Sequence, residues 1–168
     1  PKTSKGKKKE PEKTNAEKAF ENAVKIYEKI VKKNPEDDVA FFYLGRSYNK
    51  LNEDDKAAKA LRQAAKLKPE NGEYQTELAE TLINIAEYDE AVRALKKALE
   101  LDENNLQAED LMERAKAGQK RIEFGKKQLQ EKFEQQQQQE ERQSTGRPTK
   151  RVASPDETPG EEKPKPST

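Results

Sequence analysis

The sequence predicts an all-α protein in which amphipathic helices stack side by side. A 34-residue unit occurs twice, in residues 38–71 and 72–105, and the apolar residues of each copy recur at three- and four-residue spacing. This spacing places them on one stripe of a helix, and a single helix cannot bury its own stripe. The shift of 34 pairs Leu44 with Leu78, Tyr48 with Leu82, Ala57 with Ala91, Leu61 with Leu95, Ala64 with Ala98, Leu67 with Leu101 and Asn71 with Asn105.

Residues 14–37 are expected to form half of an earlier copy. Its apolar residues fall on second-helix positions, whereas the first-helix positions hold Glu10, Pro11 and Thr14, which cannot form a buried helix. A lone helix is therefore predicted from about Asn15 to Lys33, with Thr14 or Asn15 as its N-cap. Because the sequence begins at Pro1 rather than Met, an upstream segment that completes the half repeat, or carries an anchor or export signal, is an alternative.

Each full copy is predicted to be a pair of helices joined by a tight turn. The turns are expected at residues 52–55 and 86–89, and Pro69 is expected to end the second helix of the first copy because it has no amide donor. Alanines at 57 and 64, and again at 91 and 98, leave room for two helices to approach closely.

The third copy stops halfway. Ala108 and Met112 keep the first-helix pattern, but Lys116, Gly125 and Lys132 stand at positions where the repeat requires an apolar residue or alanine. One long helix is therefore expected from Leu106 to about Arg142. Residues 106–124 are predicted to cap the stack, with Ile122 and Phe124 packed back on it, and residues 125–143 to form an extended, polar, Gln-rich helix. The spacing of Leu111, Ala115, Ile122, Leu129 and Phe133 is near seven, which is typical of a seam for a partner helix or for self-association as a coiled coil. Gly118 and Gly125 interrupt that seam, so a cap followed by a frayed helix is the other interpretation.

The repeat resembles the tetratricopeptide repeat (TPR), whose unit is a pair of antiparallel helices. The residues that carry the resemblance are Phe41, Leu44, Gly45, Tyr48, Ala57, Leu61, Ala64 and Pro69 in the first copy, and Leu78, Ala79, Leu82, Tyr88, Ala91, Leu95 and Ala98 in the second. Gln75 replaces the aromatic residue and Glu103 the proline. The resemblance implies a right-handed α-solenoid of about six helices, with the first helix of each pair lining a concave face.

In the resembled family a peptide or a partner helix lies on that concave face. The matching positions here, and hence the candidate partner-binding residues, are Phe42, Arg46, Asn49, Lys50, Thr76, Glu80, Ile83 and Asn84. The other interpretation is that they are solvated helix positions. Phe42 stands out because a large aromatic residue outside the packing stripe needs cover. The clamp that holds acidic chaperone tails in some family members is not expected, because Glu80 would repel a carboxylate.

Composition excludes several kinds of chemistry. The 168 residues include no Cys, His or Trp, which excludes disulfides, Cys/His zinc sites, Cys nucleophiles and imidazole bases. The carboxylates are expected on exposed helical faces, where nothing shifts their pKa, so no catalytic residues, no metal site and no cofactor are expected, and the protein is expected not to be an enzyme. The predicted function is a non-enzymatic adaptor or scaffold that binds a protein or peptide partner. The alternative is a structural subunit of a cytoskeletal or membrane-associated assembly.

The two ends of the chain are expected to be disordered. Residues 1–13 carry six Lys against two Glu, a basic arm that could contact an anionic membrane surface, whereas nucleic acid is not expected because the arm lacks aromatic residues. Residues 144–168 are rich in proline, and Ser154 lies between Arg151 and Pro155 in a pattern typical of a phosphorylation site. The expected location is the cytoplasm, with association with a membrane as the alternative.

Overall fold

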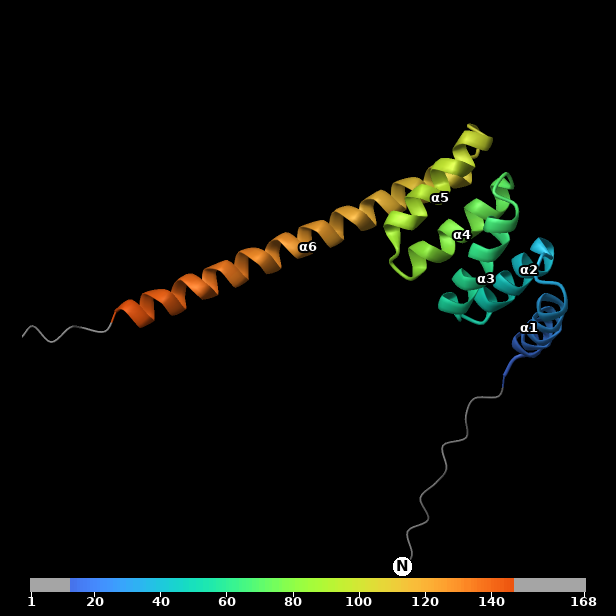
Figure 1. Ribbon diagram of the computed structural model, residues 1–168, viewed down its shortest axis with the longest axis horizontal. Helices are drawn as coiled ribbons and strands as arrows, with labels where there is room; N and C mark the ends of the chain where they lie inside the picture. The colour runs from blue at the N-terminus through green and yellow to red at the C-terminus, as the bar shows by residue number, and fades with distance from the viewer. Residues whose placement is uncertain (1–12, 147–168) are drawn as a thin grey trace, which may run out of the picture. The chain divides into compact units, whose positions relative to one another are not determined.

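The computed structural model describes residues 13–146, and the helices in that range follow the predicted order (Figure 1). They are α1 (Asn15–Lys33), α2 (Asp38–Lys50), α3 (Asp54–Leu67), α4 (Gly72–Asn84), α5 (Tyr88–Leu101) and α6 (Leu106–Thr145). The chain divides into two compact units, the first ending at Gly125 and the second beginning at Lys126. Residues 1–12 of the basic arm and residues 147–168, including Ser154, lie outside the described residues.

Side-chain caps fix the starts of α1, α2, α4 and α6, and three of these caps are separated by the repeat length. Asp37 accepts from the Ala40 N–H at 2.8 Å, Asn71 from the Tyr74 N–H at 3.2 Å and Asn105 from the Ala108 N–H at 3.0 Å. Thr14 and Glu17 form a complete capping box on α1, which confirms the predicted N-cap. Each cap satisfies an amide that the first helical turn leaves without an acceptor.

The turns between paired helices are also the same in both repeats. Asn52 and Ala86 have left-handed backbones, with φ of 57° and 61°. The following amides reach back into the helix, Glu53 N–H to Tyr48 O at 3.0 Å and Glu87 N–H to Leu82 O at 2.8 Å, which is the Schellman arrangement. The chain therefore reverses within a few residues, and α2 with α3, and α4 with α5, form antiparallel pairs.

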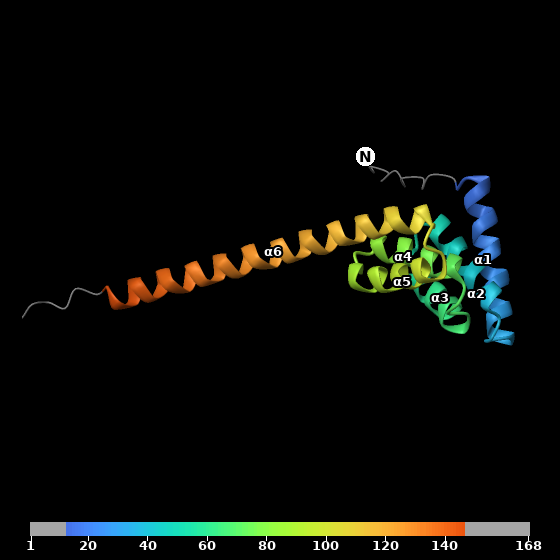
Figure 2. The same cartoon turned by 90° about the horizontal axis from the view of Figure 1, so that it is seen from above.

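The paired helices approach closely because small residues face large ones. A Cβ added to Gly45 would lie 2.5 Å from Cγ of Leu61, so only a glycine fits at this separation. Leu61, Leu82 and Leu95 are completely buried, as are the alanines at 57, 64, 91 and 98. In Figures 1 and 2 the pairs lie side by side, and α1 flanks α2 at one end of the stack.

The first half of α6 packs against α5 through Gly118. A Cβ at Gly118 would lie 2.3 Å from the Tyr88 ring, and Gln119 Nε2 donates to Asp89 Oδ1 at 2.6 Å. Gly118 is therefore a point of close contact within a continuous helix and not an interruption. The expectation that Ile122 and Phe124 pack back on the stack is wrong, because they are 46% and 63% exposed. The preceding turns supply the buried contacts instead, through Leu111, Met112 and Ala115.

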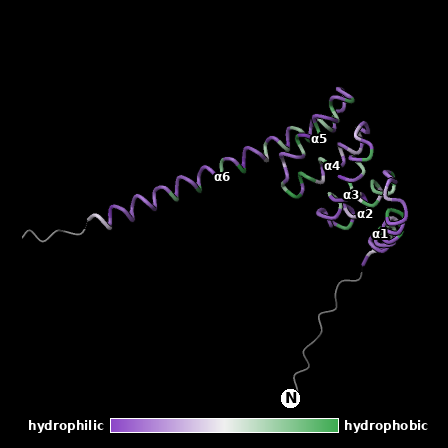
Figure 3. Tube along the Cα trace, viewed as in Figure 1, coloured by the Kyte–Doolittle hydropathy of each residue, from purple (hydrophilic) through white to green (hydrophobic). Residues whose placement is uncertain are grey.

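The second unit contains the remainder of α6. Every side chain from Lys126 to Thr145 is exposed, and the segment is mostly hydrophilic in Figure 3. Side-chain pairs one turn apart stabilise this part of the helix, such as Gln130 with Glu134 at 2.7 Å and Lys127 with Glu131 at 3.9 Å. Leu129 and Phe133 are 70% and 56% exposed, so they contact little within the described residues.

Two alanine substitutions in α6 separate helix propensity from packing. Gly125→Ala should raise the free energy of unfolding by about 1 kcal/mol, because nothing lies within 4 Å of the new Cβ and alanine favours the helix. Gly118→Ala should lower it by about 1 to 3 kcal/mol, because the same gain is outweighed by the clash with Tyr88. Urea unfolding of both variants measures the two values. Equal stabilisation by both would contradict the packing at Tyr88.

Candidate functional site

The surface between α2 and α4 is hollowed in two adjoining places, which together we call the α2–α4 groove. The hollows measure about 470 Å³ and 280 Å³, and both are lined by Arg46 and Glu77. The larger one also has Gly72, Glu73, Thr76, Asp102, Asn105 and Gln107 in its wall, and the smaller one has Asn49, Lys50, Asn52, Asp54, Glu80 and Asn84. The lining residues thus come from α2, α4, the turn after α2, the first residue of α3, the segment that joins α5 to α6, and the start of α6.

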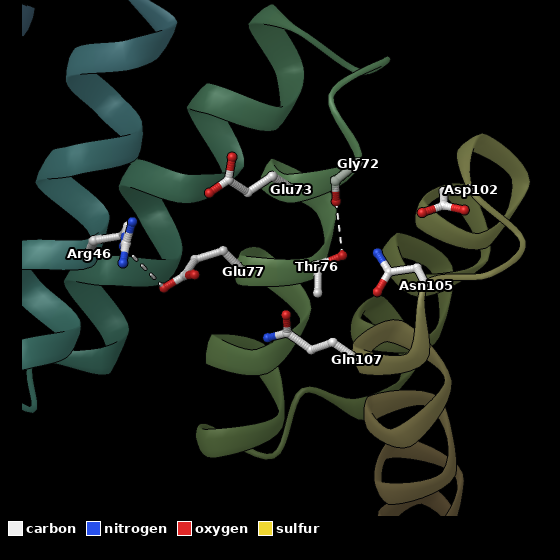
Figure 4. A pocket seen from close by; sticks show the side chains of 8 residues that line it. All are labelled: Arg46, Gly72, Glu73, Thr76, Glu77, Asp102, Asn105 and Gln107. Carbon is white, nitrogen blue, oxygen red and sulfur yellow. Dashed lines mark hydrogen bonds and ion pairs between the residues drawn. The ribbon is translucent and has the colours of Figure 1, made fainter.

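Arg46 is held in the middle of this groove. Its guanidinium carbon lies 5.6 Å from the centre of the Phe42 ring, and its Nε lies 3.9 Å from Oε1 of Glu77. Figure 4 shows Arg46 reaching from α2 toward Glu77 on α4, with Asn105 and Gln107 on the other side of the hollow. Arg46 therefore lies beside a ring and a carboxylate of its own chain, although its side chain is 44% exposed.

Carboxylates outnumber cations in the α2–α4 groove. Arg46 and Lys50 are its basic side chains, whereas the acidic ones are Asp54, Glu73, Glu77, Glu80 and Asp102. Burial raises the pKa of Glu77; Glu80 and Glu73 act in the same direction, while Arg46 and Asn49 oppose them. The ionised form of Glu77 is therefore incompletely compensated in the free protein, and an added positive charge would stabilise it.

Two polar side chains of the groove, Thr76 and Asn49, donate hydrogen bonds within the chain. Thr76 is buried, and its hydroxyl donates to the Gly72 carbonyl at 2.9 Å. Asn49 Nδ2 donates to Thr81 Oγ1 at 2.8 Å, while the Asn49 Oδ1 has no hydrogen-bond partner among the described residues. An unpaired buried acceptor is costly, and this oxygen is shielded from solvent by the side chains around it.

The structure brings together six of the eight candidate residues in the α2–α4 groove. Arg46, Asn49, Lys50, Glu80 and Asn84 line the smaller hollow, and Thr76, together with Arg46, lines the larger one. The other two are not in its wall. Phe42 is 3% exposed and stacks on Tyr74 with ring centres 4.6 Å apart, and Ile83 packs against the same core. Phe42 is covered from within the chain because α4 supplies the second ring.

Glu77 and Glu73 are groove residues that sequence reasoning missed. With Glu80 they are spaced by four and three residues along α4, which places all three on one stripe of the helix. That spacing was a readable signal. The repeat itself gives no acidic pattern there, because the position in the first repeat that matches Glu77 holds Tyr43, an aromatic residue that contacts Tyr27 and Phe42.

A separate hollow of about 540 Å³ lies between α3 and α5 and has the opposite charge. It is lined by Arg62, Lys66, Arg93 and Lys97 with Glu90 as the acidic residue, over an apolar floor of Ala65, Leu78 and Ala94. Arg62 is engaged by Glu90 through two bonds of 2.9 and 2.7 Å. The first and second helices of the repeats therefore present surfaces of different sign.

Residues 13–146 contain no group of three or more Asp or Glu side chains arranged to hold a metal ion. Within the same range, no helix combines the length and the apolar character needed to span a bilayer.

The paired helices, their common caps and the 34-residue spacing define a tetratricopeptide-repeat protein. The family model described as "Cytochrome c-type biogenesis protein H TPR domain" matches residues 28–143, from within α1 to near the end of α6. Because this match covers more than half of the 168 residues, the chain belongs to that family. None of the curated proteins matches the sequence.

Solved structures with the same fold include domains captured with peptides. The first TPR of Spaghetti (RPAP3), bound to the HSP90 peptide SRMEEVD, is 18% identical with a TM-score of 0.56 over 60% of this chain and 79% of that chain. The TPR2B domain of yeast Sti1, in complex with an Hsp70 peptide, is 23% identical with a TM-score of 0.54 over 60% and 85%. MamA is 20% identical with a TM-score of 0.52 over 64% and 72%. These likenesses concern the fold.

The raised pKa of Glu77 makes a prediction about stability. A carboxyl group whose pKa is higher in the folded state destabilises the fold once the pH rises from its unfolded pKa through the folded value. Glu77→Gln should therefore raise the free energy of unfolding at pH 7 by up to about 0.5 kcal/mol. This gain should vanish at pH 3, where the Glu77 carboxyl group is protonated and as neutral as the glutamine that replaces it. Chemical unfolding at the two pH values checks it. A gain that persists unchanged at pH 3 would show that charge is not its cause.

Proposed function

We propose that this chain is a non-enzymatic adaptor that holds a cationic segment of another protein in the α2–α4 groove and so helps to assemble or localise a larger complex. The observation that carries the proposal is the excess of carboxylates in a groove whose central cation, Arg46, is already engaged. The family description makes cytochrome c-type biogenesis the first setting in which to seek the partner.

The electrostatics of the groove favour lysine or arginine on the partner. Glu73, Glu77 and Glu80 form a row along α4, and Asp102 and Asp54 stand at its two ends. A cation placed near Glu77 would meet a carboxylate that burial has partly stripped of water, where the attraction is stronger than at a fully exposed site. Complementary charge of this kind also speeds the encounter and rejects partners of the wrong sign.

Hydrogen bonding in the groove supports the same kind of ligand. Glu73, Glu80 and Asp102 line the groove and accept hydrogen bonds when ionised. Lys and Arg side chains and peptide N–H groups are donors, so they match these acceptors. Asn84 and Lys50 at the end of the smaller hollow add donors for the carbonyl groups of a bound segment.

Acidic tails of the kind seen in related folds fit this groove poorly. The TPR domain of Spaghetti is bound to a peptide with the sequence SRMEEVD, which ends in carboxylates. In the present chain such a tail would lie against Glu77 and Glu80, while Arg46 is shared between Phe42 and Glu77. The repulsion selects against it.

A pair of charge-reversed peptides tests the proposed function. SRMEEVD should bind at least about tenfold more weakly than an analogue in which its two glutamates and its aspartate are lysines, measured by isothermal calorimetry with the full chain. The double variant Glu77→Gln with Glu80→Gln should reduce binding of the lysine analogue, whereas Glu100→Gln on the exposed side of α5 should not. Tighter binding of the acidic peptide would contradict the proposal.

A second candidate function is carried by the exposed apolar residues of α6. Phe124, Leu129 and Phe133 are 63%, 70% and 56% exposed on a helix whose other side chains in this part are polar. Leu129 and Phe133 are four residues apart and share one face, as a helical self-association seam requires. Through this segment the chain would act as a structural subunit of a larger assembly.

Sedimentation velocity distinguishes this second candidate. The full chain should associate as its concentration rises, and the double variant Leu129→Ser with Phe133→Ser should stay monomeric, because about 0.8 kcal/mol is lost per CH₂ removed from a buried contact. Leu106→Ser, at another exposed leucine, is the matched control and should associate like the unchanged chain. A chain that is monomeric at every concentration tested would exclude self-association through this face.

A further inference from the structure

Helix α1 uses only part of its apolar surface within the chain. Val24, Tyr27 and Val31 pack into the core formed with α2. A second stripe, which we call the α1 seam, consists of Ala16, Ala19, Ala23, Ile26 and Ile30. In Figure 2 α1 lies at the outer edge of the stack, and its main contact in the described structure is with α2.

The repeats themselves show what this stripe does when it is occupied. The positions of Ala23, Ile26 and Ile30 correspond to Ala57, Ala60 and Ala64 in α3 and to Ala91, Ala94 and Ala98 in α5. Those six alanines are at most 6% exposed, and Ala57 and Ala60 belong to the core that α3 shares with Leu44 and Tyr48 of α2. Ile26 is instead 56% exposed. The α1 seam is therefore a helix-packing surface that lacks its helix.

The opposite end of the stack has no such surface. In α6 the positions that correspond to Gly45 and Tyr48 hold Glu113 and Lys116, both exposed, so charged residues end the repeat there. At α1 the sequence keeps isoleucine where an end cap would carry charge. The outer surface of a terminal repeat in a solenoid is usually polar, whereas the α1 seam is apolar.

The spacing and size of the seam residues suit another helix. Ala16, Ala19, Ala23, Ile26 and Ile30 are separated by three, four, three and four residues, the spacing of the contact positions of a coiled coil. Alanine at three of them permits a close approach, and the two isoleucines provide the apolar contact. A stripe this narrow, with three alanines, offers little area to a lipid surface.

Charge around the seam selects the partner. Lys18, Lys25, Lys29 and Lys33 lie along the edge away from α2, and none forms an ion pair within residues 13–146. The acidic residues of α1 are engaged elsewhere: Glu17 in the capping box, Glu21 with Lys13, and Glu28 with the Tyr48 hydroxyl at 2.6 Å. The edge of the seam therefore carries positive charges that no carboxylate within residues 13–146 pairs with.

We propose that the α1 seam docks an acidic amphipathic helix of another protein. Residues 1–12 have no apolar side chain except proline, and residues 147–168 have only Val152, Ala153 and prolines, so neither segment has the apolar stripe that matches the seam. A second copy pairing through α1 would bring the same lysine edge against itself under two-fold symmetry, which is repulsive. A helix with glutamates beside its apolar stripe satisfies both the shape and the charge.

Fluorescence anisotropy of two labelled peptides tests this proposal on the full chain. Both peptides have about three heptads with leucine and alanine at the contact positions; one carries glutamate and the other lysine at the flanking positions. The glutamate peptide should bind at least about tenfold more tightly, and added salt should narrow the difference. Ala19→Lys and Ile26→Lys should each abolish binding while helix content and Tm are kept, because both residues are exposed.

Two controls locate the binding. Ala117→Lys, the same change at an exposed alanine of α6, should bind the glutamate peptide normally, and so should Glu77→Gln in the α2–α4 groove. Equal affinity for the two peptides, or binding that survives Ala19→Lys and Ile26→Lys, would overturn the proposal. It would also be overturned if Ile26→Lys abolished dimerisation of the chain or its binding to phosphatidylserine vesicles, because the occupant would then be a second copy or a membrane.

Discussion

Close contact between paired helices is the constraint on which the rest of this structure depends. Gly45 against Leu61, and buried alanines at 57, 64, 91 and 98, let the helices of each pair approach until large side chains fill the remaining space. Packing at this density fixes the separation and rotation of neighbouring helices. The groove between α2 and α4 follows from it, because α3 and α5 hold those two helices side by side.

The same constraint explains why the two ends of the stack differ. Each repeat of a solenoid packs against the next through the same kind of surface, so the first and last helices each expose a surface that inner helices bury. At α6 that surface carries charge, and Gly118 against Tyr88 closes the last contact. At α1 apolar residues remain on it beside lysines that form no ion pair with any residue from 13 to 146. The chain thus combines an acidic groove between α2 and α4 with an α1 seam whose edge is basic.

The fold could be predicted from the sequence because the helix ends and turns of the repeat depend on residues that are close together in the chain. The cap at Thr14, the turns at residues 52–55 and 86–89, and the helix end at Pro69 each depend on a few neighbouring residues, so they could be predicted from the sequence. The site was harder because it depends on contacts between repeats. Phe42 matched a groove position, but the Tyr74 ring, 32 residues away, buries it. Glu77 lines the groove because the face of α4 that carries it is directed toward Arg46 on α2. The packing of the repeats determines which face that is.

The claim that the α2–α4 groove is the binding surface is tested most directly by nuclear magnetic resonance. Titration of the ¹⁵N-labelled chain with the lysine analogue of SRMEEVD should shift amide signals of α2, α4 and residues 102–107, with the largest changes near Glu77 and Glu80. Signals of α1 and of the hollow between α3 and α5 should stay in place. Shifts concentrated in α1 or between α3 and α5, with α2 and α4 unchanged, would contradict the account.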